Sequence, residues 1–167
     1  MKKFSTFGLL LAILWLTGCK SSLKDFNLDF TMESVNNYRL SIEIRNDGSY
    51  HIQQQNVLFD IYAKKEQINH SEGKLTDAEF NELIKLIADS RIFKMKNTYG
   101  FNEQKSYNDS DDPLRGLIYR LNYTEGNKSK YLLVHPNSND PYSKHFSKLI
   151  GFLSNYASNH LKSDPLQ

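Results

Sequence analysis

The sequence predicts an α+β domain in which an antiparallel sheet packs against two amphipathic helices. Three observations predict this class. Apolar and polar residues alternate over 26–32 and again over 38–45, as they do in half-buried strands. Thr76 and Glu79 form a capping box at the start of a segment with helical apolar spacing. A second segment with this spacing closes the chain, after a hairpin.

The first part of the domain is expected to be a four-strand meander. Its first two strands are the alternating segments 26–32 and 38–45. Asp47-Gly48 comes directly after the second, and this dipeptide tolerates the positive φ of a tight hairpin turn. The third strand is expected to return over 50–52. Val57, Phe59 and Ile61 then share one face, which predicts a fourth strand over 57–63.

The two helices are predicted from their caps and their apolar stripes. The first should run from Asp77 to about Ser90 behind the capping box. The second should have Asp140 as its cap and Pro141 as its first residue, where a missing N–H has no cost. The residues expected to be buried are Phe80, Leu83, Ile84 and Ile87 in the first helix, and Phe146, Leu149, Ile150, Leu153, Tyr156 and Ala157 in the second.

Between the helices, residues 99–115 show no period and gather Asn, Ser, Asp and Gly. Irregular segments of this length are uncommon in compact domains and are often functional or disordered. A hairpin is expected next, with strands over 117–124 and 130–135 and a turn over 125–128.

The chain begins with the three parts of a secretory signal. Two lysines follow Met1, an almost wholly apolar run covers 7–16, and the small residues Thr17 and Gly18 precede Cys19, the only cysteine. The apolar run is too short to span a bilayer, which needs about 20 residues. The leader is therefore expected to be removed from the mature protein.

The Leu-Thr-Gly-Cys sequence that ends at Cys19 resembles the lipobox of bacterial lipoproteins. The resemblance implies a diacylglyceryl group on Cys19, cleavage before it and acylation of the new amino terminus. One acyl chain binds membranes only marginally, whereas several hold a protein durably. The expected partner of Cys19 is thus the lipid bilayer, and the expected location is the cell envelope, on the periplasmic side of the outer or inner membrane. A signal peptide with an incidental cysteine is the alternative.

This interpretation divides the chain into four parts: a signal peptide over 1–18, a lipidated tether over 19–25, a single α+β domain over 26–161 and a tail over 162–167.

Several short motifs follow one another through the domain. They are Tyr38-x-Leu40-x-Ile42, Asp47-Gly48, Leu75-Thr76 before an acidic helix, Ile92-Phe93 after it, and Asp112-Pro113 before a strand. Their order resembles an uncharacterised domain family of bacterial lipoproteins over about residues 25–161. Members of that family carry a Cys-Pro pair where this chain has Asn36-Asn37. The family implies a fold and a location, and no activity.

Charge excludes one class of partner. The chain has 21 basic and 19 acidic residues, and removal of the leader takes away Lys2 and Lys3. The mature part is then neutral, with 19 residues of each sign. A nucleic-acid-binding protein would need a basic patch or stripe, so no nucleic-acid partner is expected.

The sequence offers no motif for catalysis or for a cofactor. The histidines at 51, 70, 135, 145 and 160 lack a metal-ligand spacing, so no metal is expected. Residues 108–112 are rich in Asn and Asp, but the Gly and Glu of a calcium-binding EF-hand loop are absent. Glu79 and Glu82 lie on one helix face without a sign of a cleft between them. We therefore expect no cofactor and no enzymatic activity, while an envelope hydrolase with a site assembled by the fold stays open.

Exposed aromatic residues are the remaining functional signal. Tyr99, Phe101 and Tyr107 lie in or beside the irregular segment, and Arg115 ends it. Tyrosine and arginine are common anchors of protein interfaces. Tyr142, at the entry to the last helix, is expected in the same cluster. The sequence thus predicts a non-enzymatic binding module for a protein or envelope component. The alternative is an immunity protein against a toxin that acts in the periplasm.

Overall fold

The computed structural model describes residues 25–34, 38–55, 68–100, 117–135 and 140–161. Its elements, in chain order, are β1 (Phe26–Ser34), β2 (Tyr38–Arg45), β3 (Ser49–Gln55), β4 (Ile68–Lys74), the helix α3 (Asp77–Ser90), the 3-10 helix η1 (Ile92–Lys94), β5 (Thr98–Tyr99), β6 (Leu117–Glu125), β7 (Lys128–Val134) and the helix α4 (Lys144–His160).

The described strands form one sheet in the order β4-β3-β2-β1-β6-β7-β5. Every neighbouring pair is antiparallel except β5 and β7, which are parallel. The predicted α+β class is confirmed, and β1 to β4 form a meander. The strand predicted over 57–63 lies outside the described residues. The fourth strand that the structure describes is β4, which the sequence analysis did not predict.

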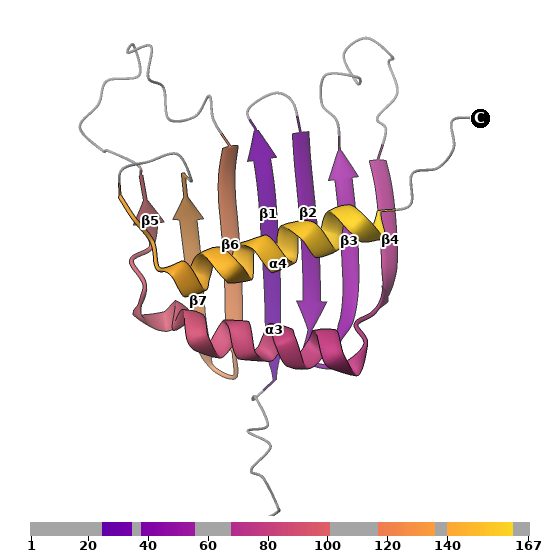
Figure 1. Cartoon of the computed structure of the whole chain (residues 1–167), viewed down its shortest axis with the longest axis horizontal. Helices are drawn as coiled ribbons and strands as arrows, with labels where there is room; N and C mark the ends of the chain where they lie inside the picture. Colours follow the sequence, from indigo (N-terminus) through magenta and orange to yellow (C-terminus); the bar gives the residue numbers. More distant parts are fainter. Residues whose placement is uncertain (1–24, 35–37, 56–67, 101–116, 136–139, 162–167) are drawn as a thin grey trace, which may run out of the picture.

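Both helices lie on the same face of the sheet and run across its strands (Figure 1). They pack against each other, and α4 also packs on β2. The described part of the domain therefore has two layers, and its helices lie on one face of the sheet. We call the opposite face the open face. No helix in the described part of the chain is long and apolar enough to cross a membrane.

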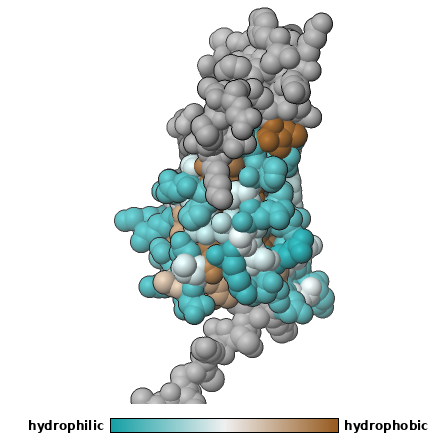
Figure 2. Space-filling view, turned by 90° about the vertical axis from the view of Figure 1, so that its right-hand side faces the viewer, coloured by the Kyte–Doolittle hydropathy of each residue, from teal (hydrophilic) through white to brown (hydrophobic). Residues whose placement is uncertain are grey.

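The core lies between the sheet and the helices. Alternate residues of β1, β2 and β3 point into it, because successive side chains of a strand point to opposite faces. All six residues predicted to be buried in α4 are buried. In α3, Leu83 and Ile87 are buried, while Phe80 and Ile84 are partly buried against the core. The surface at the β4 side of the domain is mostly hydrophilic (Figure 2).

The predicted start of α3 is confirmed, and the predicted start of α4 is wrong. The hydroxyl of Thr76 accepts a hydrogen bond from the backbone N–H of Glu79, and the Glu79 carboxylate accepts one from the Thr76 N–H. In α4 the cap is Ser143, whose Oγ accepts from the backbone N–H of Phe146 at 3.1 Å. Asp140 and Pro141 therefore precede the helix, because Ser143 is the residue whose hydroxyl accepts from an unpaired N–H of the first turn.

The sheet has two distinct ends. At the first, the backbone carbonyl of Asp25 accepts from the N–H of Gly126 at 2.9 Å, and the carbonyl of Phe26 accepts from that of Asn46 at 3.1 Å. The chain thus enters β1 between the β2–β3 and β6–β7 turns, and we call this the tether end. Strands β1, β3, β5 and β7 run away from it and finish at the opposite end, which we call the far end (Figure 1).

Candidate functional site

The segment that the sequence analysis singled out is attached to the far end. The chain leaves the described part after Gly100, just beyond β5, and returns at Leu117, where β6 begins. Phe101, Tyr107 and Arg115 lie outside the described residues. The two flanking strands place both attachment points of the segment at the end of the sheet opposite to the tether.

Tyr99 supports the attachment point of this segment and leaves little of its own surface free. It is buried, with 8% of its surface exposed. Its hydroxyl accepts a hydrogen bond from the backbone N–H of Lys96 at 3.1 Å. Its ring meets that of Tyr142 edge-on at 6.1 Å, and Tyr142 meets Phe146 in the same way at 5.6 Å. These contacts join β5 to the core, so Tyr99 can offer a partner only a small area.

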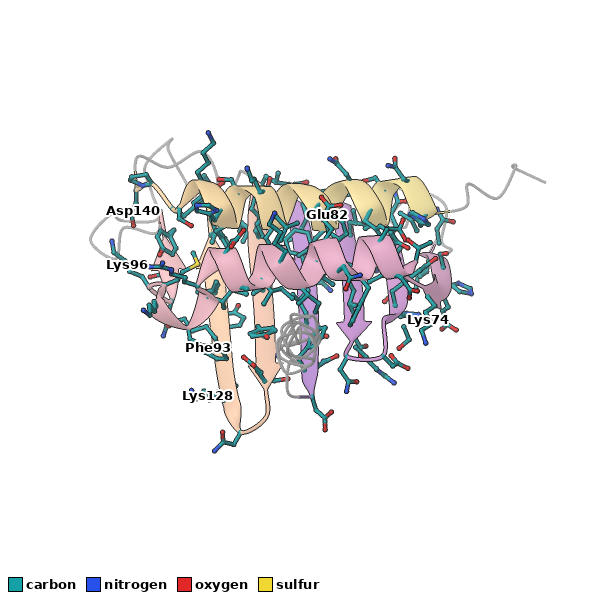
Figure 3. All side chains as sticks on the ribbon, turned by 60° about the horizontal axis from the view of Figure 1, so that its bottom comes forward. Lys74, Glu82, Phe93, Lys96, Lys128 and Asp140 are labelled. Carbon is teal, nitrogen blue, oxygen red and sulfur yellow. The ribbon has the colours of Figure 1, made fainter. Side chains whose placement is uncertain are left out.

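An ion pair and two hydrogen bonds hold the chain just before β5. Lys96 Nζ lies 3.3 Å from Asp140 Oδ1, which ties the approach to β5 to the residues before α4 (Figure 3). Lys130 Nζ donates to the carbonyl of Met95 at 2.5 Å and to Oδ1 of Asn97 at 2.6 Å. The chain just before β5 is therefore held by Asp140 on one side and by Lys130 of β7 on the other.

The open face of the sheet carries a row of ionisable residues. By register, Asp29, Glu43, His51 and Glu72 lie side by side on β1 to β4. Nδ1 of His51 is 2.9 Å from Oε1 of Glu72. Burial raises the pKa of Asp29 above its usual range, and the charge of Glu43 raises it further. Hydrogen bonds from Asn27 and Asn122 oppose this rise, and Arg45 Nε lies 3.0 Å from Oε1 of Glu43.

A second ionic group lies on the open face near the far end. Glu33 is flanked by Arg39 of β2, with Oε2 and Nη2 3.1 Å apart, and by Arg120 of β6, which contacts its Oε1. Only 15% of the Glu33 side chain is exposed. One carboxylate thus joins three neighbouring strands, and its two oxygens are each used by one arginine.

A groove runs between the two helices on the side away from the sheet, with a volume of about 1080 Å³. Glu79, Glu82 and Asp89 of α3 lie along it, opposite His145 and Lys148 of α4. Leu86 and Phe152 add apolar surface. Lys85 also lies on the α3 wall, so charges of both signs line the groove.

Glu79, one of the two helix carboxylates, is unsuited to act as a general acid. Hydrogen bonds from the backbone and the hydroxyl of Thr76 lower the pKa of Glu79, so this group is held as a carboxylate. A general acid would need a raised pKa. Among the described residues, no three His, Cys, Asp or Glu side chains are grouped so that they could hold a metal ion.

The ionic groups of the open face were not predicted from the sequence. The alternation of polar and apolar residues gave part of the information, because Asp29, Glu33 and Glu43 occupy the polar positions of two predicted strands. The residues that lie opposite them on the neighbouring strands follow only from the register of the strand pairing. In addition, β4, which supplies Glu72, was not predicted.

We compared the chain with models of known protein families and with curated proteins, and neither comparison found a match. The proposed functions below therefore rest on the residues and the geometry of this chain.

Proposed function

We propose that this protein is a lipoprotein of the bacterial cell envelope, anchored through an acylated Cys19, whose domain binds a protein partner through its far end. The observation that carries the proposal is the position of the two ends. The chain enters the sheet at the tether end, and the segment with the expected interface residues is attached at the opposite end.

Dimensions support this arrangement. Residues 19–25 span at most about 25 Å when fully extended, at 3.3–3.6 Å per residue. The nine residues of β1 cover about 30 Å at 3.3 Å per residue. A short tether would keep the tether end close to the bilayer, while the sheet would carry the far end well beyond the headgroups. Segments attached there would be accessible to another protein.

The described contacts at the far end suit a rigid platform for binding. Tyr99, Tyr142 and Lys96 fix the chain where the 101–116 segment begins, and Arg120 and Glu33 join the strands beside the point where it ends. Binding is tighter when the contact residues are held in place beforehand, because less conformational entropy is lost. Within the segment, Phe101, Tyr107 and Arg115 remain the predicted contacts.

The proposal is tested by capture of partners from solubilised envelopes with the acylated full chain. A variant that lacks residues 102–109 should capture less of the partner while its thermal unfolding stays unchanged. A matched control, Lys148→Glu in the groove between the helices, should capture as much as the natural chain. Loss of capture in the control but not in the deletion variant would move the interface to the helices and contradict the proposal. A captured toxin would identify the protein as an immunity protein.

A further inference from the structure

A basic and aromatic patch lies at the tether end of the domain. It consists of Arg91, Phe93 and Lys94, which follow α3, and Lys128, the first residue of β7. All four are exposed, and Phe93 shows 37% of its surface. Lys128 Nζ lies over the Phe93 ring, 5.9 Å from its centre (Figure 3). We call these four residues the Phe93 patch.

Local backbone structure turns Phe93 outward. Arg91 ends α3 in the left-handed conformation, with a φ of 51°. The N–H of Lys94 then donates to the carbonyl of Arg91 at 2.8 Å, which closes a tight turn. Within this turn Ile92 is buried, with 2% of its surface exposed, whereas Phe93 is partly exposed. The turn thus places Ile92 in the core and leaves part of the Phe93 ring at the surface.

The patch is close to the point where the tether joins the sheet. The Phe93 ring packs on Tyr123 of β6 at 5.4 Å, and Tyr123 packs on Phe26, the first residue of β1, at 6.1 Å. A single aromatic side chain therefore separates Phe93 from the start of the sheet. Residues 19–25 are too short to carry this end of the domain far from an acylated Cys19.

The charges of the patch favour an anionic surface. In the tether, Lys20 and Lys24 exceed Asp25 by one charge, and Arg91, Lys94 and Lys128 of the patch supply three positive charges. Glu125 lies opposite Lys128 in the β6–β7 pairing and offsets one of them. The nearby Asp89 lines the groove between the helices instead. A net positive charge thus surrounds an exposed aromatic ring, a combination that suits membrane interfaces.

We propose that the Phe93 patch contacts the bilayer surface and binds anionic lipid headgroups, so that the domain stands on the membrane in a fixed orientation. This inference rests on the proposed anchoring through Cys19. The ring of Phe93 would lie at the level of the headgroups, and the basic side chains would neutralise lipid phosphates. The acyl chains would hold the protein at the membrane, and the patch would direct the far end away from it.

Single tryptophans provide the test. The only tryptophan of the chain, Trp15, lies in the leader, so the proposed mature protein has none. The acylated full-length product of Phe93→Trp is placed in vesicles of phosphatidylglycerol and phosphatidylethanolamine that carry brominated acyl chains. Its matched control is Ile68→Trp. Ile68 is 39% exposed, a fraction similar to that of Phe93, but it begins β4 at the far end.

The inference predicts blue-shifted emission and strong quenching for Trp at position 93, and neither effect at position 68. Adding Lys94→Glu and Lys128→Glu should reduce the quenching at position 93, as each basic residue near an anionic surface changes membrane partitioning about fivefold. Equal quenching at the two positions would overturn the inference. Quenching at position 93 that does not change with Lys94→Glu and Lys128→Glu would overturn it too. Flotation of the vesicles separates the two proposals. Protein that floats without quenching contradicts the patch alone, whereas protein that does not float contradicts the anchoring on which the patch depends.

Discussion

Tyr50 lies across Gly73 of the neighbouring strand, and its hydroxyl is 2.6 Å from the position that a Cβ on residue 73 would take. The same ring meets Tyr156 edge-on at 5.3 Å and His160 at 6.0 Å. Tyr50 therefore connects β4, at the side of the sheet, to the C-terminal turns of α4. The absence of a side chain at position 73 is what allows this contact.

Gly73→Ala should destabilise the domain by about 1–2 kcal/mol, because the added methyl group forces the Tyr50 ring from its place between β4 and α4. Gly151→Ala is the matched control. A Cβ there meets no atom within 4 Å, and alanine is the better helix former, so this variant should be as stable as the natural chain or slightly more stable. Urea unfolding measures both. Equal stability of the two variants would contradict the packing described for Tyr50.

Thr76→Ala should lower the free energy of unfolding by about 1 kcal/mol, because the N–H of Glu79 loses its acceptor at the start of α3. Thr76→Ser keeps the hydroxyl and should retain most of the stability. Thermal unfolding of the three proteins provides the measurement. An unchanged melting temperature for the alanine variant would count against the capping box.

Acid should remove a contribution that Glu79 makes to stability. Its pKa is lowered in the folded protein by hydrogen bonds from Thr76, so the carboxylate favours folding at pH values above its unfolded pKa of 4.5. This contribution is lost as the pH falls through the lower, folded pKa. Glu79→Gln should therefore be less stable than the natural chain at pH 7, and the difference should shrink below about pH 4. A difference that is constant from pH 7 to pH 3 would contradict this assignment.

The two arginines beside Glu33 should contribute unequally to stability. The side chain of Arg120 is 37% exposed and that of Arg39 is 55% exposed, so water screens the pair with Arg39 more strongly. Arg120→Ala should cost about 1 kcal/mol and Arg39→Ala about half as much or less. Chemical denaturation of both variants decides the order. A larger loss for Arg39→Ala would show that exposure does not control these two interactions.

The sequence predicted the elements that bury a regular apolar pattern. β2 covers the predicted residues 38–45, α3 covers the predicted 77–90, and the predicted stripe of α4 is buried throughout. In each of these elements, local pattern and core packing favour the same structure, so the pattern alone was sufficient.

β4 and β5 were not predicted because they lack such a pattern. β4 has one large apolar residue, Ile68, and it is held by pairing with β3 and by the ring of Tyr50 over Gly73. β5 has only two residues, and it forms by parallel pairing with β7. Both strands depend on contacts between residues far apart in the chain. A local sequence pattern does not reveal such contacts.

Of the four residues predicted for partner binding, the structure describes Tyr99. Tyr99 was expected to be available to a partner, and the ring contacts with Tyr142 instead place most of it in the core. Phe93, in contrast, was counted only as part of a motif, because a single phenylalanine in a sequence gives no sign of its exposure. The left-handed Arg91, which turns it outward, is known only from the backbone.

The account depends most on the state of Cys19 in the living cell. Mass spectrometry of the membrane-bound protein tests this directly. We predict that its amino-terminal residue is Cys19, with a diacylglyceryl group on the sulfur and an acyl chain on the amino group. A free thiol at Cys19, or a chain that retains residues 1–18, would contradict the account.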